Sequence, residues 1–409
     1  MRDVATGHGN GRYCHGMLPL ISGLGIAQII SWGSLFNAIG VLGPAMRRDL
    51  GVSELYLFSA FTAGLFVSGA LAPVMGSLID RRGGRLVLSL GSALAIVALL
   101  TLAFAPNEYV MVAGWLLAGA AMSGCLYDPA FATLSQHTGP RYRKAVTGLT
   151  LFGGFASTVF WPLSHLLLEA WGWRTTFGIY AAMHLCLCLP IHQLLVPKHS
   201  HLTQAEARPK VDAAGAPGLA DPRIVWLAGS FALATFIFGV IAVHLINLLT
   251  TAGLTPAQAV TISMLMGPMQ VASRVIELGF SGRVRAVTFG LVTFGLMMLA
   301  LLALINVEGF GIMSIAFVIA FGCGNGLLTI VRGSAPAELF GTQGLGAVLG
   351  YLSRAAFFAK AIAPASFSAL LTFGFTRNAA LSTLVALAIA GGATYAMAVR
   401  QKPVPQAAP

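Results

Sequence analysis

The segment Gly76-Ser-Leu-Ile-Asp80-Arg-Arg-Gly-Gly-Arg85 decides the fold of this chain, because it places four charges between two apolar runs, 54–79 and 86–105. A charged side chain in the centre of a bilayer costs roughly 2.5–3.5 kcal/mol on insertion scales, so this segment cannot lie in hydrocarbon. It is therefore predicted to be a turn held at a membrane surface. Glycine at position 76 permits close helix contact, and glycine at position 83 permits a sharp reversal.

The composition excludes a soluble protein. Charged residues make up 9% of the 409 residues and apolar residues 57%, and the mean hydropathy is +0.82. A soluble protein carries about 25% charged residues, so the chain is predicted to cross a membrane many times. No nucleotide-binding loop, catalytic triad or metal-ligand cluster is evident. We therefore expect neither an enzyme nor a resident metal or cofactor.

Apolar runs recur along the whole chain, and each is long enough to cross about 30 Å of hydrocarbon. The runs predict an all-α membrane protein with twelve transmembrane helices. We place them at 18–41, 54–79, 86–105, 109–135, 145–169, 174–196, 224–250, 256–280, 286–305, 310–333, 344–372 and 378–398.

The connections between these spans alternate in charge. With the N-terminus inside, seventeen Lys and Arg residues fall in cytoplasmic segments, against only Arg47, Arg48, Arg174 and Arg377 on the other face. Because basic residues are retained on the cytoplasmic side, both termini are predicted to be cytoplasmic. The net charge of +11 is then an orientation signal and not a nucleic-acid-binding patch.

One long polar segment, 197–223, divides the chain into two six-helix halves. A weak internal repeat supports this division, since Gly124-Cys125 recurs as Gly322-Cys323, and Asp80 corresponds to Glu277, at an offset of about 197 residues. The predicted boundaries are an N-tail at 1–17, an N-terminal half at 18–196, a linker at 197–223, a C-terminal half at 224–398 and a C-tail at 399–409.

The spacing of Gly76, Leu78, Asp80, Arg81, Gly83 and Arg85 resembles the signature of the loop between spans two and three of the major facilitator superfamily. Gly84 departs from it, because the family has a basic residue there. The resemblance implies a secondary transporter of the bacterial inner membrane, with two pseudo-symmetric halves that rock around a midplane site. It also implies a conformational latch made of Gly76, Asp80, Arg81, Gly83 and Arg85, with Asp80 at the start of span eleven, near 342–344.

In that superfamily spans 1, 4, 7 and 10 line the central cavity, and spans 2, 5, 8 and 11 flank it. The resemblance thus puts Gln28, Asn37, Asp128, His244 and Asn325 on cavity helices. It puts Arg274, Arg354 and Lys360 on flanking helices.

Three local stretches are similar to the monocarboxylate porter family: Gly267 to Arg274, Arg143 to Gly154, and Ser31-Trp32-Gly33. The resemblance implies that Arg274 binds a substrate carboxylate, for which a planar guanidinium is well suited. Gln270, one helical turn earlier, stands where the family has an acidic partner. The alternative is that Arg274 only bonds helix-end carbonyls. The predicted substrate-binding residues are Arg274, Gln270, Lys360, Asn325, Gln28 and Asn37.

Two further residues have alternative roles. Asp128 either carries protons or pairs with the arginines at 81, 82 and 85 as a latch. His244 either shuttles protons or packs between helices.

The expected function is transport of a small organic anion, with a proton as a candidate co-substrate, by a monomer embedded in the lipid bilayer. Efflux of a drug or of an arsenical compound is the alternative, the latter through the thiols of Cys125 and Cys323. A non-transporting membrane sensor is the third hypothesis, but the linker and tails are too short for a signalling domain.

Overall fold

The computed structural model describes residues 10–198 and 221–401, with side chains from residue 17 onward. The predictions for the first residues of the N-tail, for most of the linker and for the end of the C-tail lie outside these ranges.

The first half is built from helices, two of which contain π-helical segments. In chain order the elements are α1 (Asn10–Ser31), η1 (Trp32–Asn37), α2 (Ala38–Leu50), α3 (Glu54–Arg82), α4 (Gly84–Ala103), α5 (Glu108–Cys125), α6 (Tyr127–Thr138), η2 (Gly139–Arg141), α7 (Tyr142–Gly154), α8 (Ala156–Met183), η3 (His184–Cys188) and α9 (Leu189–Leu194).

The second half is also helical, and the described part of the chain forms no β-sheet. Its elements are α11 (Pro222–Thr250), α12 (Pro256–Met264), α13 (Met266–Phe280), α14 (Ala286–Ile305), α15 (Ile312–Phe340), α16 (Leu345–Thr372) and α17 (Arg377–Arg400).

Ten helical stretches within the described ranges are long and apolar enough to cross a membrane. One of them, Glu108–Leu194, contains three of the predicted spans. Its backbone turns at Gly139, with φ of 49°, and at Gly172, with φ of 75°. These positive φ values divide the stretch into three passes, so the fold agrees with the predicted twelve-helix class.

Side-chain caps fix where several spans begin. Ser53 accepts a hydrogen bond from the Tyr56 amide at 3.1 Å, and Asn107 accepts one from the Val110 amide at 3.1 Å. Thr255 and Gln258 form a reciprocal capping box at the start of α12. Each cap satisfies backbone donors that the first helical turn leaves without partners.

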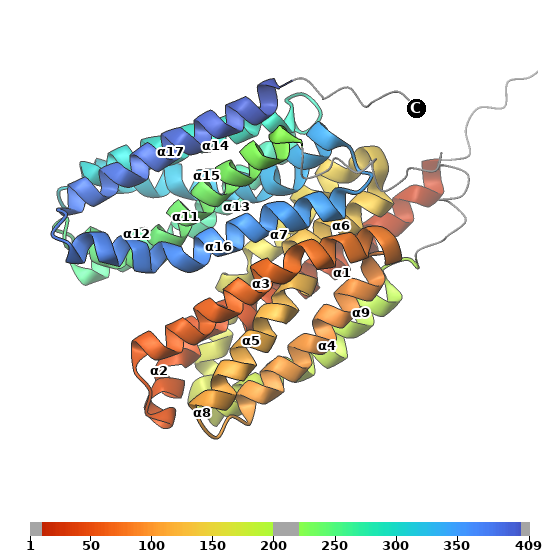
Figure 1. The fold of residues 1–409 in the computed structure, drawn as a ribbon, viewed down its shortest axis with the longest axis horizontal. Helices are drawn as coiled ribbons and strands as arrows, with labels where there is room; N and C mark the ends of the chain where they lie inside the picture. The colour runs from red at the N-terminus through yellow and green to blue at the C-terminus, as the bar shows by residue number, and fades with distance from the viewer. Residues whose placement is uncertain (1–9, 199–220, 402–409) are drawn as a thin grey trace, which may run out of the picture.

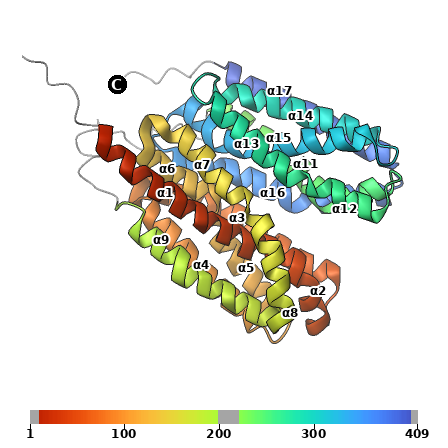
Figure 2. The same ribbon diagram turned by 180° about the vertical axis from the view of Figure 1, so that it is seen from behind.

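The second half has a core cluster of its own, whereas two other core clusters contain residues of both halves. One core cluster consists only of residues between Ile224 and Ala398. Across the boundary, α3 packs along α16, and α7 packs against α13 and α15. We call the end of the bundle where both described termini lie the terminal end. The halves are close at that end and diverge toward the opposite end (Figures 1 and 2).

Candidate functional site

The carboxylate of Asp80, at the end of α3, reaches across to the first turn of α16 in the other half. Its Oδ1 accepts a hydrogen bond from the Gly346 amide at 3.0 Å, and its Oδ2 accepts one from the Ala347 amide at 2.7 Å. An anion at this position satisfies free N–H groups and the positive end of the helix dipole. The contact lies a few residues beyond the predicted 342–344.

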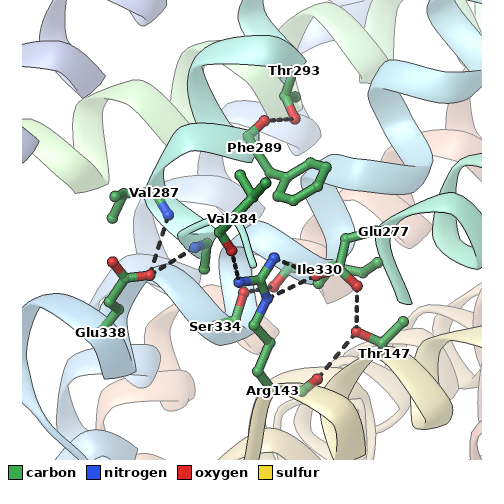
Figure 3. Close-up of polar contacts among 11 residues, drawn as sticks. Arg143, Thr147, Glu277, Val284, Val287, Phe289, Thr293, Ile330, Ser334 and Glu338 are labelled. Carbon is green, nitrogen blue, oxygen red and sulfur yellow. Dashed lines mark hydrogen bonds and ion pairs between the residues drawn. The ribbon is translucent and has the colours of Figure 1, made fainter. Parts of the chain in front are cut away.

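A second carboxylate, Glu277 near the end of α13, makes the corresponding crossing in the opposite direction (Figure 3). It is 1% exposed and forms an ion pair with Arg143 of α7 at 2.7 Å. The hydroxyl of Thr147 donates to its other oxygen at 2.7 Å. Arg143 also donates to the Val284 carbonyl and lies over the ring of Phe289, so its guanidinium contacts the second half at three points.

Asp128, in the first turn of α6, forms an ion pair at 3.3 Å with Arg332 of α15. The prediction that it pairs with the arginines of the turn between α3 and α4 is wrong. Arg81 and Arg82 are exposed at the end of α3, and Arg85 donates to Gln193 at 3.4 Å within its own half. These guanidinium groups lie at the surface, whereas Asp128 faces the other half.

Glycines allow the closest backbone contacts between α3 and α16. A Cβ on Gly76 would collide with the Gly346 carbonyl, and one on Gly350 would collide with the Ala72 carbonyl. The turn itself needs glycine, since Gly83 has a φ of 84°. Gly84 is equally constrained, because a Cβ there would collide with the Thr133 side chain. A longer side chain at this position would meet the same contact.

Arg274 lies deep between the halves. It is 3% exposed, and its Nη1 donates to the Thr150 carbonyl of α7 at 2.8 Å. Its Nη2 contacts the Thr329 hydroxyl of α15 at 3.5 Å, and its Nε has no hydrogen-bond partner among the described residues. Within the described ranges no carboxylate forms an ion pair with this guanidinium.

Lys360 of α16 reaches into a group of aromatic rings from both halves. Its Nζ lies 3.7 Å from the ring centre of Phe36 and 5.4 Å from that of Trp32, both in η1. It also lies 5.5 Å from the ring centre of Phe238 of α11. The contacts that the structure shows for this ammonium are therefore with ring faces.

The other predicted site residues fall into two groups. Gln270, Asn325 and Asn37 are half-buried on α13, α15 and η1, and no side-chain hydrogen bond of theirs appears in the described structure. Gln28 does not join them, because it is fully buried in the first half and donates to the Cys125 carbonyl at 2.8 Å. His244 contacts the Pro364 carbonyl at 3.1 Å and the ring of Phe367, so it packs α11 against α16.

Several residues of this interface were not predicted as site residues. Arg332 lies at the end of the predicted span 310–333, and α15 continues to Phe340, so the residue stays inside the helix. Glu277 had a sequence signal, namely its repeat relation to Asp80. Tyr142, whose hydroxyl donates to the Gly333 carbonyl at 2.8 Å, had none.

The two thiols on which the arsenical alternative rests, those of Cys125 and Cys323, have different surroundings. Cys125 is fully buried in the core of the first half, whereas Cys323 of α15 contacts the Met269 carbonyl at 3.6 Å. The described residues contain no group of three or more His, Cys, Asp or Glu side chains that could hold a metal ion.

Comparisons with known proteins agree with this architecture. The chain is 28% identical over 201 residues to the riboflavin transporter RibJ of Trypanosoma cruzi, covering 47% of this chain and 41% of that protein. It is 32% identical over 149 residues to the multidrug resistance protein MdtL of Escherichia coli, covering 36% of this chain and 37% of that protein. These two matches span about two fifths of the length of each relative.

A longer match is to a gentisate transporter of Corynebacterium glutamicum, with 25% identity over 356 residues, 83% of this chain and 78% of that protein. The crystal structure of FucP in the outward conformation superposes with a TM-score of 0.71 at 14% identity, covering 95% of this chain and 100% of that one. At this identity the likeness shows the fold alone.

A model of the Major Facilitator Superfamily matches residues 24–364, which is most of the chain. Members of this family carry small molecules across membranes and are not enzymes. With its helical fold and the cross-half contacts described above, the chain belongs to the Major Facilitator Superfamily.

Proposed function

We propose that this chain is a secondary active transporter of a small organic anion that works by alternating access. The observation that carries this proposal is the guanidinium of Arg274, which is buried between the halves without an acidic partner in the described ranges. The guanidiniums of Arg143, Arg223 and Arg332 each have a carboxylate, and that of the half-buried Arg377 donates to two backbone carbonyls. A buried charge needs an opposite charge or a set of hydrogen bonds, and an anionic substrate would supply the missing partner.

Contacts with backbone carbonyls do not satisfy all the hydrogen-bond donors of the Arg274 guanidinium. The Thr150 carbonyl satisfies one donor, but Nε has no acceptor within 10–198 and 221–401. A carboxylate can accept two parallel hydrogen bonds from one guanidinium. Gln270, one turn away on α13, removes the competing acid that would otherwise neutralise Arg274.

Proton coupling is assigned in this proposal to Asp128. Its ion pair with Arg332 joins α6 of one half to α15 of the other, so the pair must separate when the halves part at this end. Separation of the pair would expose the Asp128 carboxylate, and this is the step at which the proposal couples transport to a proton.

The orientation belongs to the same proposal. The excess of basic residues on the segments at the terminal end supports cytoplasmic termini in a bacterial inner membrane. The conformation described here is then closed toward the cytoplasm. Single-cysteine reporters at Asn107 and Arg400, in a background without the five native cysteines, are expected to be labelled from opposite sides of the membrane. Labelling of both from one side would contradict this topology.

The relatives support an organic substrate but differ in its charge. A gentisate transporter carries an organic anion by its name, whereas MdtL is named for multidrug resistance. Drug efflux therefore remains a second candidate, favoured by the 32% identity to MdtL over part of the chain. A neutral or cationic drug would not need Arg274, and this difference separates the two candidates.

The test is ligand binding to the purified protein and to variants of Arg274. We would measure how far the thermal unfolding temperature of the protein rises with lactate, benzoate, gentisate, arsenite and the cationic dye ethidium. Arg274→Gln is expected to abolish carboxylate binding, because loss of one partner of a buried ion contact costs about 3–5 kcal/mol. Arg274→Lys keeps the charge but loses the planar guanidinium, so carboxylate binding should weaken less than in Arg274→Gln.

The matched control is Arg48→Gln, at an exposed arginine with no ion pair in the described structure. It should bind every ligand as the parent does. Unchanged carboxylate binding in Arg274→Gln would refute the organic-anion proposal. Loss of ethidium binding in Asp128→Asn, with Arg274→Gln tolerated, would favour the drug-efflux candidate.

A further inference from the structure

A continuous row of aromatic rings connects Lys360 to Arg274. The rings of Trp32 and Phe36 lie 5.3 Å apart, and the Lys360 ammonium lies over both. The Trp32 ring also lies 5.2 Å from that of Tyr127. The rings of Trp32, Phe36 and Tyr127 are all half-buried, so they are not sealed within the core of the first half.

The last ring of the row, that of Tyr127, lies on the surface of α7, beside the guanidinium that Arg274 extends from α13. A Cβ on Gly153 would collide with the Tyr127 hydroxyl, and one on the adjacent Gly154 would collide with Arg274 Nη1. The phenol and the guanidinium therefore lie next to each other against two consecutive glycines. We call the set Trp32, Phe36, Tyr127, Lys360 and Arg274 the aromatic row.

The polar atoms of this row are mostly donors without a protein acceptor. Nε1 of Trp32 and Nε of Arg274 are buried and make no hydrogen bond to any residue that the structure describes, and the described contacts of Lys360 Nζ are with ring faces. A cationic ligand would meet two positive charges here. A ligand rich in acceptors would satisfy the donors, and a flat ring would pack against the half-buried rings of Trp32 and Tyr127.

Resting on the proposed anion transport, we infer that the transported anion is an aromatic carboxylate. Its carboxylate is held by Arg274, and its ring lies against Trp32 and Tyr127 of the first half. An aliphatic acid would satisfy Arg274 equally well but would make no ring–ring contact with Trp32 or with Tyr127, whose ring already stacks on Phe131. Specificity for the ring therefore resides in the first half, and recognition of the charge resides in the second.

The inference is tested on the purified full-length protein with two ligands of nearly equal size, benzoate and cyclohexanecarboxylate. Both carry one carboxylate, and only benzoate has a π face. We expect benzoate to bind about 2- to 12-fold more tightly, the range that aromatic pairing contributes beyond buried area. The measurement is isothermal titration of the parent, so it does not depend on a variant that could misfold.

Variants then locate the preference. Trp32→Leu keeps an apolar side chain but removes the ring, so it should bring the two affinities together. Trp171→Leu makes the same change at a tryptophan that is 61% exposed, and it should leave the preference intact. A preference that survives in Trp32→Leu would overturn the assignment of the ring to the aromatic row.

The outcomes separate this inference from the proposed function. Equal affinity of the parent for both acids would overturn the aromatic inference and leave anion transport standing. Unchanged binding of both acids in Arg274→Gln would overturn the proposed function itself. Binding of ethidium with no binding of either acid would overturn both.

Discussion

Asp80 and Glu277 occupy corresponding positions in the two halves, about 197 residues apart, yet they cross to the other half by different chemistry. Asp80 accepts from two backbone amides at the start of α16 and contacts no cation among the pairs that the structure shows. Glu277 accepts from the guanidinium of Arg143 and the hydroxyl of Thr147 on α7. One carboxylate is held by a helix terminus, the other by side chains.

The difference in chemistry affects how strongly each carboxylate holds the two halves together at the terminal end. A helix terminus is always present, so the partners of Asp80 do not depend on any side chain. Glu277 holds a charged side chain, Arg143, that would be left without its acid if Glu277 were lost. The two contacts together join the halves at the terminal end, but they should respond unequally to neutralisation of the carboxylate.

The largest effect is expected for Glu277→Gln. The substitution leaves the Arg143 guanidinium partly buried without a carboxylate, a loss that costs about 3–5 kcal/mol in comparable buried pairs. The cost applies only while the terminal end is closed, because Arg143 is hydrated once the halves part. The population with that end open should therefore rise more than about 100-fold, measured by accessibility of a single cysteine placed at Val146, which is fully buried against Gly333 of α15.

Glu338→Gln is the matched control. Glu338 pairs with Arg285 at 2.6 Å and accepts from the Ala286 amide at 2.7 Å, both within the second half. Its loss should lower thermal stability without changing the accessibility of position 146. Equal effects of the two substitutions would contradict a cross-half role for Glu277.

A smaller effect is expected for Asp80→Asn. The asparagine keeps one oxygen for one of the two amides of α16 but loses the negative charge at the helix terminus. A charge at a helix end is worth about 0.3–2 kcal/mol, so the open population should rise by about 2- to 30-fold. The same accessibility assay measures it, with Asp221→Asn as the control, since Asp221 caps α11 within one half.

The sequence predicts the spans well because hydropathy and length are local properties. The spans 256–280 and 286–305 coincide with the observed helical stretches. The contact of Asp80 with the start of span eleven was also predictable, because the family signature fixes both its chemistry and its place. Gly76 was expected to allow close helix contact, and its neighbour is the Gly346 backbone.

The partners inside the interface could not be predicted in this way. Which cation faces Asp128 depends on how α6 and α15 pack, and their contacting residues lie 204 positions apart in the chain. The aromatic surroundings of Lys360 depend on the π-helical segment η1, which changes the direction of the side chains after Ser31. A period of 3.6 residues does not predict that change.

The most direct test of the account is a pair of distance measurements between spin labels on the two halves. Labels at Arg82 and Arg283 report on the terminal end, and labels at Leu55 and Phe373 report on the opposite end. All four positions are exposed. In the parent we predict a dominant short distance for the first pair. In a variant with both Asp80→Asn and Glu277→Gln, the first distance should lengthen while the second shortens. Distances that do not change, or that both change in the same direction, would contradict alternating access controlled by these two carboxylates.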